Sequence, residues 1–362
     1  MFGLKSNLRV GLDIGSHAVK MVVAEKAGHG RQKLVKALCR DIYSGKDKYD
    51  PDGPKKATVV PLILEMFQEI GVRPRTISHL ATCLSGTNMA TKELRTLQLP
   101  EEEMNSSVIA EARKHLPLDG SESMVDYMML GEDQREVDKL RVLVAATTKR
   151  TFDSHLDVLR ELELRPGVVD LEPLAAVNSY LGTKELPDEG VVVFLNLGAR
   201  RTNLVILGRK DMFFSRDLPV GGAMFTETIM KTFDVPYVEA EELKKTKGLS
   251  GEVKQEPEVA QPTGTLGALS LRDKSPLEKL GDEINRSLRY YVKETGQAQF
   301  MKFVLLGGPA ENEELCDSMA KKFSVPVEAY DPFSAIDGEP DVKNRSQFAA
   351  AIGLATRANA IT

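Results

Sequence analysis

The sequence contains no tryptophan and few other aromatic residues. Phe, Trp and Tyr together make up 6% of its 362 residues. Proteins that bind single-stranded nucleic acid usually stack the bases on aromatic side chains, so this composition argues against that function. The net charge is −5, which provides no overall positive field to attract nucleic acid or an acidic membrane surface.

Cysteine and long apolar runs are also scarce. Cys39, Cys83 and Cys316 lie far apart and form no C-x-x-C motif, which predicts reduced thiols in a cytosolic protein rather than disulfides or a zinc site. The opening residues MFGLKSNLRVG lack the apolar segment of a signal peptide, and no window of about 18 apolar residues could span a bilayer. We therefore expect a cytoplasmic protein, which a partner would have to hold in place if it works at a membrane.

A buried-looking strand that ends in an acid is the first feature that points to a site. The stretch VGLDIGSHAVKMVVAEK places Asp13 before a Gly15-Ser16 turn, and Lys20 on the outgoing strand. A cleft would solvate the carboxylate, which would otherwise be costly to bury. There Asp13 could hold Mg²⁺ through water, and the turn and Lys20 could surround a triphosphate. An ordinary β-hairpin with His17 exposed in its turn is equally compatible with this stretch alone.

Two later segments repeat parts of this design. VVVFLNLGARRTNLVIL is again strand, turn and strand, with Gly198 in the turn and Thr202 beyond it. KFVLLGGPAENEEL places Gly307 and Gly308 between a buried strand and a helix, where a flat ligand can approach the backbone and the helix start favours anions. The recurrence predicts two related α/β halves, each with a sheet of mixed strand order.

In this order and spacing, the segments resemble the actin-like ATPase superfamily, which includes actin, heat-shock chaperones, sugar kinases, FtsA and PilM. LDIGSHAVK resembles its first phosphate loop, VVDLEPLAAV its connecting segment, LNLGARRTNLVI its second phosphate loop and VLLGGPAENEEL its adenosine segment. The resemblance implies a duplicated, ribonuclease H-like fold with ATP and Mg²⁺ between two lobes, Asp13 facing the metal and Glu172 orienting the attacking water. The nucleotide-binding residues that it implies are Asp13, Gly15, Ser16, Lys20, Asn196, Gly198, Thr202, Gly307 and Gly308, with Glu283 and Arg286 flanking the adenosine.

Further segments narrow the resemblance to the PilM family of type IV pilus assembly. LQLPEEEMNSSVIAEARKHLPLDGSESMVDYMML is similar to the α+β insert of that family, and VLVAATTKR, SRDLPVGGAMFTETI, EINRSLRYY, VPVEAYDPF and FAAAIGLATR also match. The resemblance implies an ATP-binding adaptor that binds the N-terminal cytoplasmic peptide of the inner-membrane protein PilN. Contacts with the platform protein PilC and with the motor ATPases, as well as self-association, are further implications.

The resemblance also predicts how the chain is divided. The first lobe is expected to combine residues 7–78, 166–186 and 336–358. An FtsA-like insert with two helices on one face of a small sheet is expected at 79–165, and the second lobe at 187–335. The composition of residues 247–276, rich in Gly, Pro, Ser, Gln and Glu without a period, predicts a mobile loop.

The second phosphate loop departs from the superfamily, because Asn196 stands where an acid is usual. Asn keeps a carbonyl oxygen but loses the charge that attracts Mg²⁺, so we predict retention of ATP with weak or no hydrolysis. Arg200 and Arg201 either pair with phosphate or are solvated turn residues.

Three other functions remain within the superfamily. A membrane-bound division protein like FtsA is disfavoured by the ending GLATRANAIT, which has no amphipathic basic helix. A sugar kinase needs a catalytic acid that is not recognisable here. The type II secretion counterpart carries a fused transmembrane helix, for which the sequence has no candidate.

Overall fold

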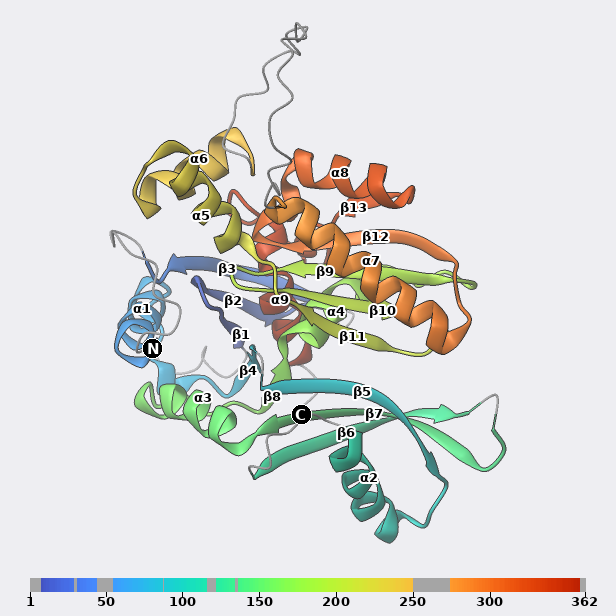
Figure 1. The fold of residues 1–362 in the computed structure, drawn as a ribbon. Helices are drawn as coiled ribbons and strands as arrows, with labels where there is room; N and C mark the ends of the chain where they lie inside the picture. The colour runs from blue at the N-terminus through green and yellow to red at the C-terminus, as the bar shows by residue number, and fades with distance from the viewer. Residues whose placement is uncertain are drawn as a thin grey trace, which may run out of the picture.

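The computed structural model describes residues 8–28, 31–43, 55–86, 88–115, 122–133, 136–249 and 274–358. Within these ranges the chain forms three β-sheets that are flanked by helices (Figure 1). Most of the predicted loop, residues 250–273, lies outside them. None of the helices in this part of the chain is long and apolar enough to cross a membrane.

The first sheet has five strands in the order β3-β2-β1-β4-β8. The first three run antiparallel to their neighbours, and β4 and β8 add in parallel. Their near-continuous apolar sequences suit strands that are covered on both faces. The strands are β1 (Leu8–Ile14), β2 (Ala18–Lys26), β3 (Gln32–Asp41), β4 (His79–Leu84) and β8 (Val168–Leu171).

Helices cover both faces of this sheet. On one face α1 (Lys55–Glu69) and α3 (Lys149–Glu161) pack on β1 and β2 in a common core. On the other face lies α9 (Ala349–Arg357), which follows the short 3-10 helix η5 (Ser346–Phe348). We call this sheet with α1, α3 and α9 the first lobe.

The second sheet repeats the same strand order, as β11-β10-β9-β12-β13. Again the first three strands are antiparallel and the last two are added in parallel. This repetition confirms the predicted duplication with mixed sheet order. The strands are β9 (Val191–Leu197), β10 (Thr202–Leu207), β11 (Phe214–Leu218), β12 (Phe300–Gly307) and β13 (Val327–Ala329).

The helices of the second half pack mainly on one face of the second sheet. We call this sheet with α5 to α8 the second lobe. The helices are α5 (Gly222–Phe233), α6 (Tyr237–Lys247), α7 (Pro276–Thr295) and α8 (Glu313–Phe323), and the remaining 3-10 helices are η2 (Pro74–Thr76), η3 (Gly308–Glu311) and η4 (Pro332–Ala335). Helix α6 had no counterpart in the sequence expectation.

The two lobes meet through α4 (Glu172–Leu181), which packs on the second sheet and against α9 in a shared core (Figure 1). Two glycines allow α9 to pack this closely, Gly353 against α4 and Gly11 of β1 against α9. A Cβ on Gly353 would lie 1.8 Å from the carbonyl oxygen of Ala175, and a Cβ on Gly11 would lie 2.1 Å from that of Ala351. Any side chain at either position would push the backbones apart.

Replacing Gly353 by Ala is therefore expected to lower the free energy of unfolding by about 3 kcal/mol, the upper end of the usual cost of overpacking. Helix propensity alone predicts the opposite sign, a gain of about 1 kcal/mol. Urea unfolding gives the free energy of unfolding of Gly353→Ala, and its sign separates the two effects. The control is Gly28→Ala, whose Cβ meets nothing within 4 Å. Equal stability of both variants would contradict the close α4–α9 contact.

The third sheet is an insert between β4 and β8 of the first lobe, with the antiparallel order β5-β7-β6. Its elements are β5 (Met89–Leu97), α2 (Glu101–His115), β6 (Ser123–Glu132) and β7 (Lys139–Thr148). Helix α2 alone shares its core. The expected second covering helix, α3, instead buries Leu159 in the first lobe, and β4 pairs with β1 there. The sheet with α2 thus spans 89–148, which is narrower than the expected insert at 79–165.

Candidate functional site

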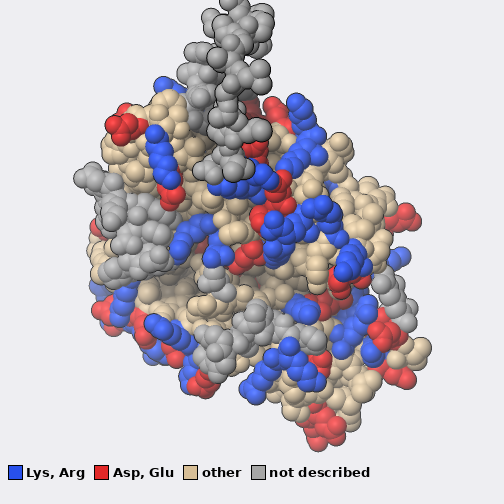
Figure 2. Space-filling model, in the orientation of Figure 1, with Lys and Arg blue, Asp and Glu red and all other residues tan. Residues whose placement is uncertain are grey.

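A cleft of about 2560 Å³ opens between the two lobes. It exceeds the roughly 300–1,000 Å³ of a typical small-molecule pocket, so it has room for a nucleotide and for further groups. Lys and Arg are interspersed with Asp and Glu on the face of the molecule in Figure 2. The predicted site residues on its walls are Asp13, Gly15, Ser16, Lys20, Glu172, Asn196, Gly198, Gly307 and Gly308.

Asp13 ends β1 and is paired with Lys20 on β2. The two residues are directly opposite in the strand register, with Lys20 Nζ 3.1 Å from Asp13 Oδ2. The Asp13 side chain is only 3% exposed, so the ion pair accounts for an acid at this depth. Burial alone would lower the pKa of Lys20, but the charges of Asp13, Cys39 and Glu172 raise it above its ordinary value. Lys20 is thus a permanent cation on the cleft wall.

The turn between β1 and β2 differs from the expectation in two respects. The N–H of Gly15 donates to the carbonyl of Ala18 (3.1 Å), so it closes the turn and does not face a ligand. What Gly15 provides is space, because a Cβ there would lie 2.9 Å from the carbonyl oxygen of Ala18 and 3.4 Å from Lys20 Nζ. His17, expected to be an exposed turn residue, is 22% exposed, and its Nδ1 lies 3.0 Å from the hydroxyl of Tyr237 on α6.

The hairpin of β9 and β10 reproduces that of β1 and β2. Gly198 N–H closes its turn by donating to the carbonyl of Arg201 (2.9 Å), as Gly15 does in the first hairpin. Asn196 and Asn203 face each other in the register, with the same separation along the chain as Asp13 and Lys20. A charged pair in the first lobe is therefore replaced by two neutral amides in the second.

Glu172, the first residue of α4, lies where the two hairpins converge. Asn196 Nδ2 donates to Glu172 Oε1 (3.0 Å). Burial and the nearby carboxylate of Asp13 raise the pKa of Glu172 to about 7, against the opposing effects of Lys20 and of the Asn196 hydrogen bond. A carboxyl group whose pKa lies this close to neutral pH can take up or release a proton there, as a general base must.

The two glycines of the third segment have different roles. Gly307 has a φ of +92°, and a Cβ there would lie 2.3 Å from the carbonyl oxygen of Leu197, so it allows β12 to approach β9. A Cβ on Gly308 would meet nothing within 4 Å. Gly308 is thus the member of the pair beside which a flat ligand has space.

Three predicted residues are not on the walls of the cleft. Thr202 is fully buried, and its hydroxyl donates to the carbonyl of Val220 (2.8 Å). Glu283 accepts a hydrogen bond from Arg286 on the same helix (2.7 Å) and lies 3.5 Å from Arg216. That these three residues bind the nucleotide stays a prediction. The contacts described above join them to other residues of the protein.

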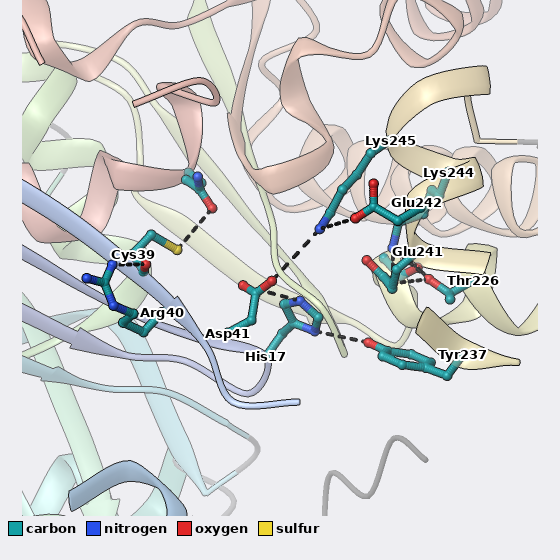
Figure 3. A network of polar contacts seen from close by, with 12 residues as sticks. His17, Cys39, Arg40, Asp41, Thr226, Tyr237, Glu241, Glu242, Lys244 and Lys245 are labelled. Atoms are coloured by element: carbon teal, nitrogen blue, oxygen red, sulfur yellow. Dashed lines mark hydrogen bonds and ion pairs between the residues drawn. The ribbon is translucent and has the colours of Figure 1, made fainter. Parts of the chain in front are cut away.

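Helix α6 connects the second lobe to the first beside the turn between β1 and β2 (Figure 3). Tyr237 packs in the first-lobe core and bonds His17, while Lys245 Nζ lies 3.8 Å from Asp41 Oδ2 at the end of β3. Sequence signals for this helix were available: Pro236 before it, Glu239 in its first turn, lysines in its last turn and a glycine after it. Its contact with His17 had no sequence signal.

Metal ligands are sparse in the part of the chain that the structure describes. No group of three or more His, Cys, Asp or Glu side chains there is arranged to hold a metal ion. Asp13 already has Lys20 as a partner, which fits contact with a hydrated Mg²⁺ better than direct ligation. Magnesium would therefore be held mainly by the phosphates of a bound nucleotide.

Comparison with known proteins identifies the family to which this chain belongs. Residues 11–359 match the model of a family described as type IV pilus assembly protein PilM. The chain belongs to the PilM family. A solved PilM-PilN type IV pilus biogenesis complex contains a chain with 26% identity and a TM-score of 0.77, and the match covers 97% of this chain and 98% of that one.

More distant structures share the fold of the PilM family. The ethanolamine utilization protein EutJ from Carboxydothermus hydrogenoformans has 14% identity and a TM-score of 0.51, with 98% of this chain and 90% of that chain covered. A diol dehydratase-reactivating factor in nucleotide-free form has 11% identity and a TM-score of 0.53, with 98% and 100% covered. With the two matching sheets, these likenesses confirm the predicted actin-like α/β fold.

Proposed function

We propose that this member of the PilM family is an adaptor that retains MgATP in the interlobe cleft and binds the N-terminal cytoplasmic peptide of PilN through its insert. The observation that carries the nucleotide part is the pair of matched hairpins on the cleft walls, each with a glycine turn closed by the same backbone hydrogen bond. Contacts with PilC and the motor ATPases, peripheral location at the inner membrane and self-association belong to the same proposal and rest on family membership.

Each cleft residue has a distinct role toward the nucleotide. Lys20 and the hydroxyl and N–H of Ser16 would bind phosphate oxygens, Asp13 would accept from water on Mg²⁺, and the open side of Gly308 would receive the adenosine. MgATP supplies the transferable phosphoryl group when bound. Asn196 carries no charge to attract Mg²⁺ and the attacking water, which favours retention over turnover even though the raised pKa of Glu172 suits a proton acceptor.

The insert offers an edge strand for the peptide. Among the described strands β6 pairs with β7 alone, and Val125 and Tyr127 face the core under α2. The alternate residues Met124 and Met128 are exposed, the latter at 57%. An extended peptide could pair with such an edge and place apolar side chains against the methionines. The partner of the similar chain in the PilM-PilN complex supports PilN as the occupant.

Titration with a synthetic peptide of the PilN N-terminus, followed by calorimetry with and without MgATP, tests both parts. Met128→Ser is expected to weaken peptide binding about tenfold, as loss of a central apolar contact does. Met301→Ser removes a methionine that is 39% exposed on the second lobe and should leave the affinity unchanged. Absence of peptide binding to the unmodified chain would refute the adaptor role. Phosphoryl transfer that depended on an added sugar would favour a kinase instead.

A further inference from the structure

A row of three polar side chains crosses the second sheet at the wall of the cleft. Asn196 on β9, Asn203 on β10 and Asp217 on β11 lie directly opposite one another in the strand register. Asn203 Nδ2 donates to Asp217 Oδ1 (2.6 Å), and Asn196 Nδ2 donates to Asn203 Oδ1 (3.2 Å). Because Asn196 also donates to Glu172, an unbroken chain of hydrogen bonds joins Asp217 to Glu172.

The charge at one end of this row determines the direction of every bond in it. A carboxylate can only accept, so Asn203 must turn its amino group toward Asp217 and its carbonyl oxygen toward Asn196. Asn196 must then direct its amino group to Asn203 and Glu172. Its carbonyl oxygen is left as the atom that can meet a donor in the cleft. With a neutral group in place of Asp217, Asn203 could rotate by half a turn, and Glu172 alone would then hold the amide of Asn196 in its present direction.

The equivalent row of the first sheet carries its acid on a different strand. There the register places Asp13 on β1, Lys20 on β2 and Cys39 on β3, so the acid is on the first strand. In the second sheet the acid is on the third strand, two strands away from Asn196. The second lobe therefore keeps a half-buried negative charge on the cleft wall, and two amides join that charge to Glu172.

We propose that Asp217 is a positioning residue of the nucleotide site, which acts through Asn203 to present the carbonyl oxygen of Asn196 to water on a nucleotide-bound Mg²⁺ and to hold Glu172 in place. The inference rests on the proposed function, because it takes MgATP as the ligand. It deepens that proposal by assigning the metal-dependent part of binding in the second lobe to Asp217, which is not among the nucleotide-binding residues that the superfamily resemblance implies.

The test compares ATP affinity with MgCl₂ and with EDTA, by calorimetry, in the full chain. Asp217→Asn is expected to weaken binding about tenfold in Mg²⁺, the lower end of the loss seen when an outer-shell partner of a metal site is removed. In EDTA the affinity should change less than about twofold, because the phosphate contacts of Lys20 remain. Asp211→Asn is the matched control, since Asp211 accepts from Gln297 outside the cleft.

A second variant, Asn203→Ser, breaks the row at its middle and should give the same Mg²⁺-specific loss. A merely structural role would instead weaken binding equally in Mg²⁺ and EDTA. If the unmodified chain binds MgATP and both variants keep its Mg²⁺ dependence, the inference is overturned and the proposed function stands. If the unmodified chain binds no ATP under either condition, both are overturned.

Discussion

Replacing Asp13 by Asn is expected to weaken the binding of MgATP by between about 10-fold and 100-fold, which corresponds to the roughly 1.5–3 kcal/mol of a hydrogen bond to a charged group. The carboxylate ends β1 at the cleft wall, 3.1 Å from Lys20. When a phosphate takes over Lys20, Asp13 becomes free to accept from water on the metal. Asn offers only one acceptor and no charge to that water.

If Asp13 acts on the metal, the loss of ATP affinity in Asp13→Asn depends on Mg²⁺, whereas general damage to the fold would lower the affinity in every condition. Without Mg²⁺, Asp13 repels the phosphates, so Asp13→Asn should leave the affinity for ATP in EDTA unchanged or raise it. Ser16→Ala is the matched control on the same turn, and we expect it to weaken binding less than about threefold because the backbone N–H remains. Isothermal titration of the unmodified chain, Asp13→Asn and Ser16→Ala with ATP, in Mg²⁺ and in EDTA, measures these differences in affinity. An equal loss in both conditions would contradict the metal role of Asp13.

Sequence patterns were sufficient to predict the hairpins and their duplication, because both depend on short-range signals. Alternating apolar residues around a glycine turn specify a hairpin locally, and the same pattern at Gly15 and Gly198 produced two sheets of the same strand order. The acid at the end of β1 does line the cleft, but Lys20 rather than solvent accounts for an acid at that depth.

The partners of these side chains could not be predicted in the same way. Asp217 reaches Asn196 only because β11 pairs with β10, and nothing in the local sequence around Asp217 indicates that contact. Thr202 follows the Gly198 turn in the chain, yet its strand turns the hydroxyl toward Val220 and away from the cleft. Helix α3 has an amphipathic pattern that fits either neighbouring sheet, and packing in the first lobe decided between them.

Replacing Asn196 by Asp is expected to create a site that responds to Mg²⁺ even without nucleotide. The substitution removes the N–H that donates to Glu172 Oε1 at 3.0 Å and places an oxygen there instead. Asn203 cannot compensate, because turning its amide would break the bond to Asp217. Two acids at this distance share one proton, so the pKa of Glu172, already about 7, should rise further.

The sign of the resulting pH dependence follows from proton linkage. A carboxyl group whose pKa is higher in the folded chain binds more protons there than when unfolded, so stability falls as pH rises through that interval. For the unmodified chain Glu172 contributes this fall between about pH 4.5 and 7. In Asn196→Asp the fall should continue above pH 7. Saturating MgCl₂ should reverse it, because an ion bound at 100 times its Kd stabilises the folded chain by about 2.7 kcal/mol.

Thermal unfolding at pH 6, 7 and 8.5, with and without MgCl₂, measures both effects in one series. Asn196→Ser is the matched control, since it also removes the amide donor but adds no charge. It should destabilise the chain without making its stability depend on Mg²⁺. ATP turnover above that of the unmodified chain, seen only in Asn196→Asp, would show that the neutral amide is what limits hydrolysis. If Mg²⁺ shifts the unfolding of Asn196→Asp no more than that of Asn196→Ser, the carboxyl groups of residues 13, 172 and 196 do not act as one site.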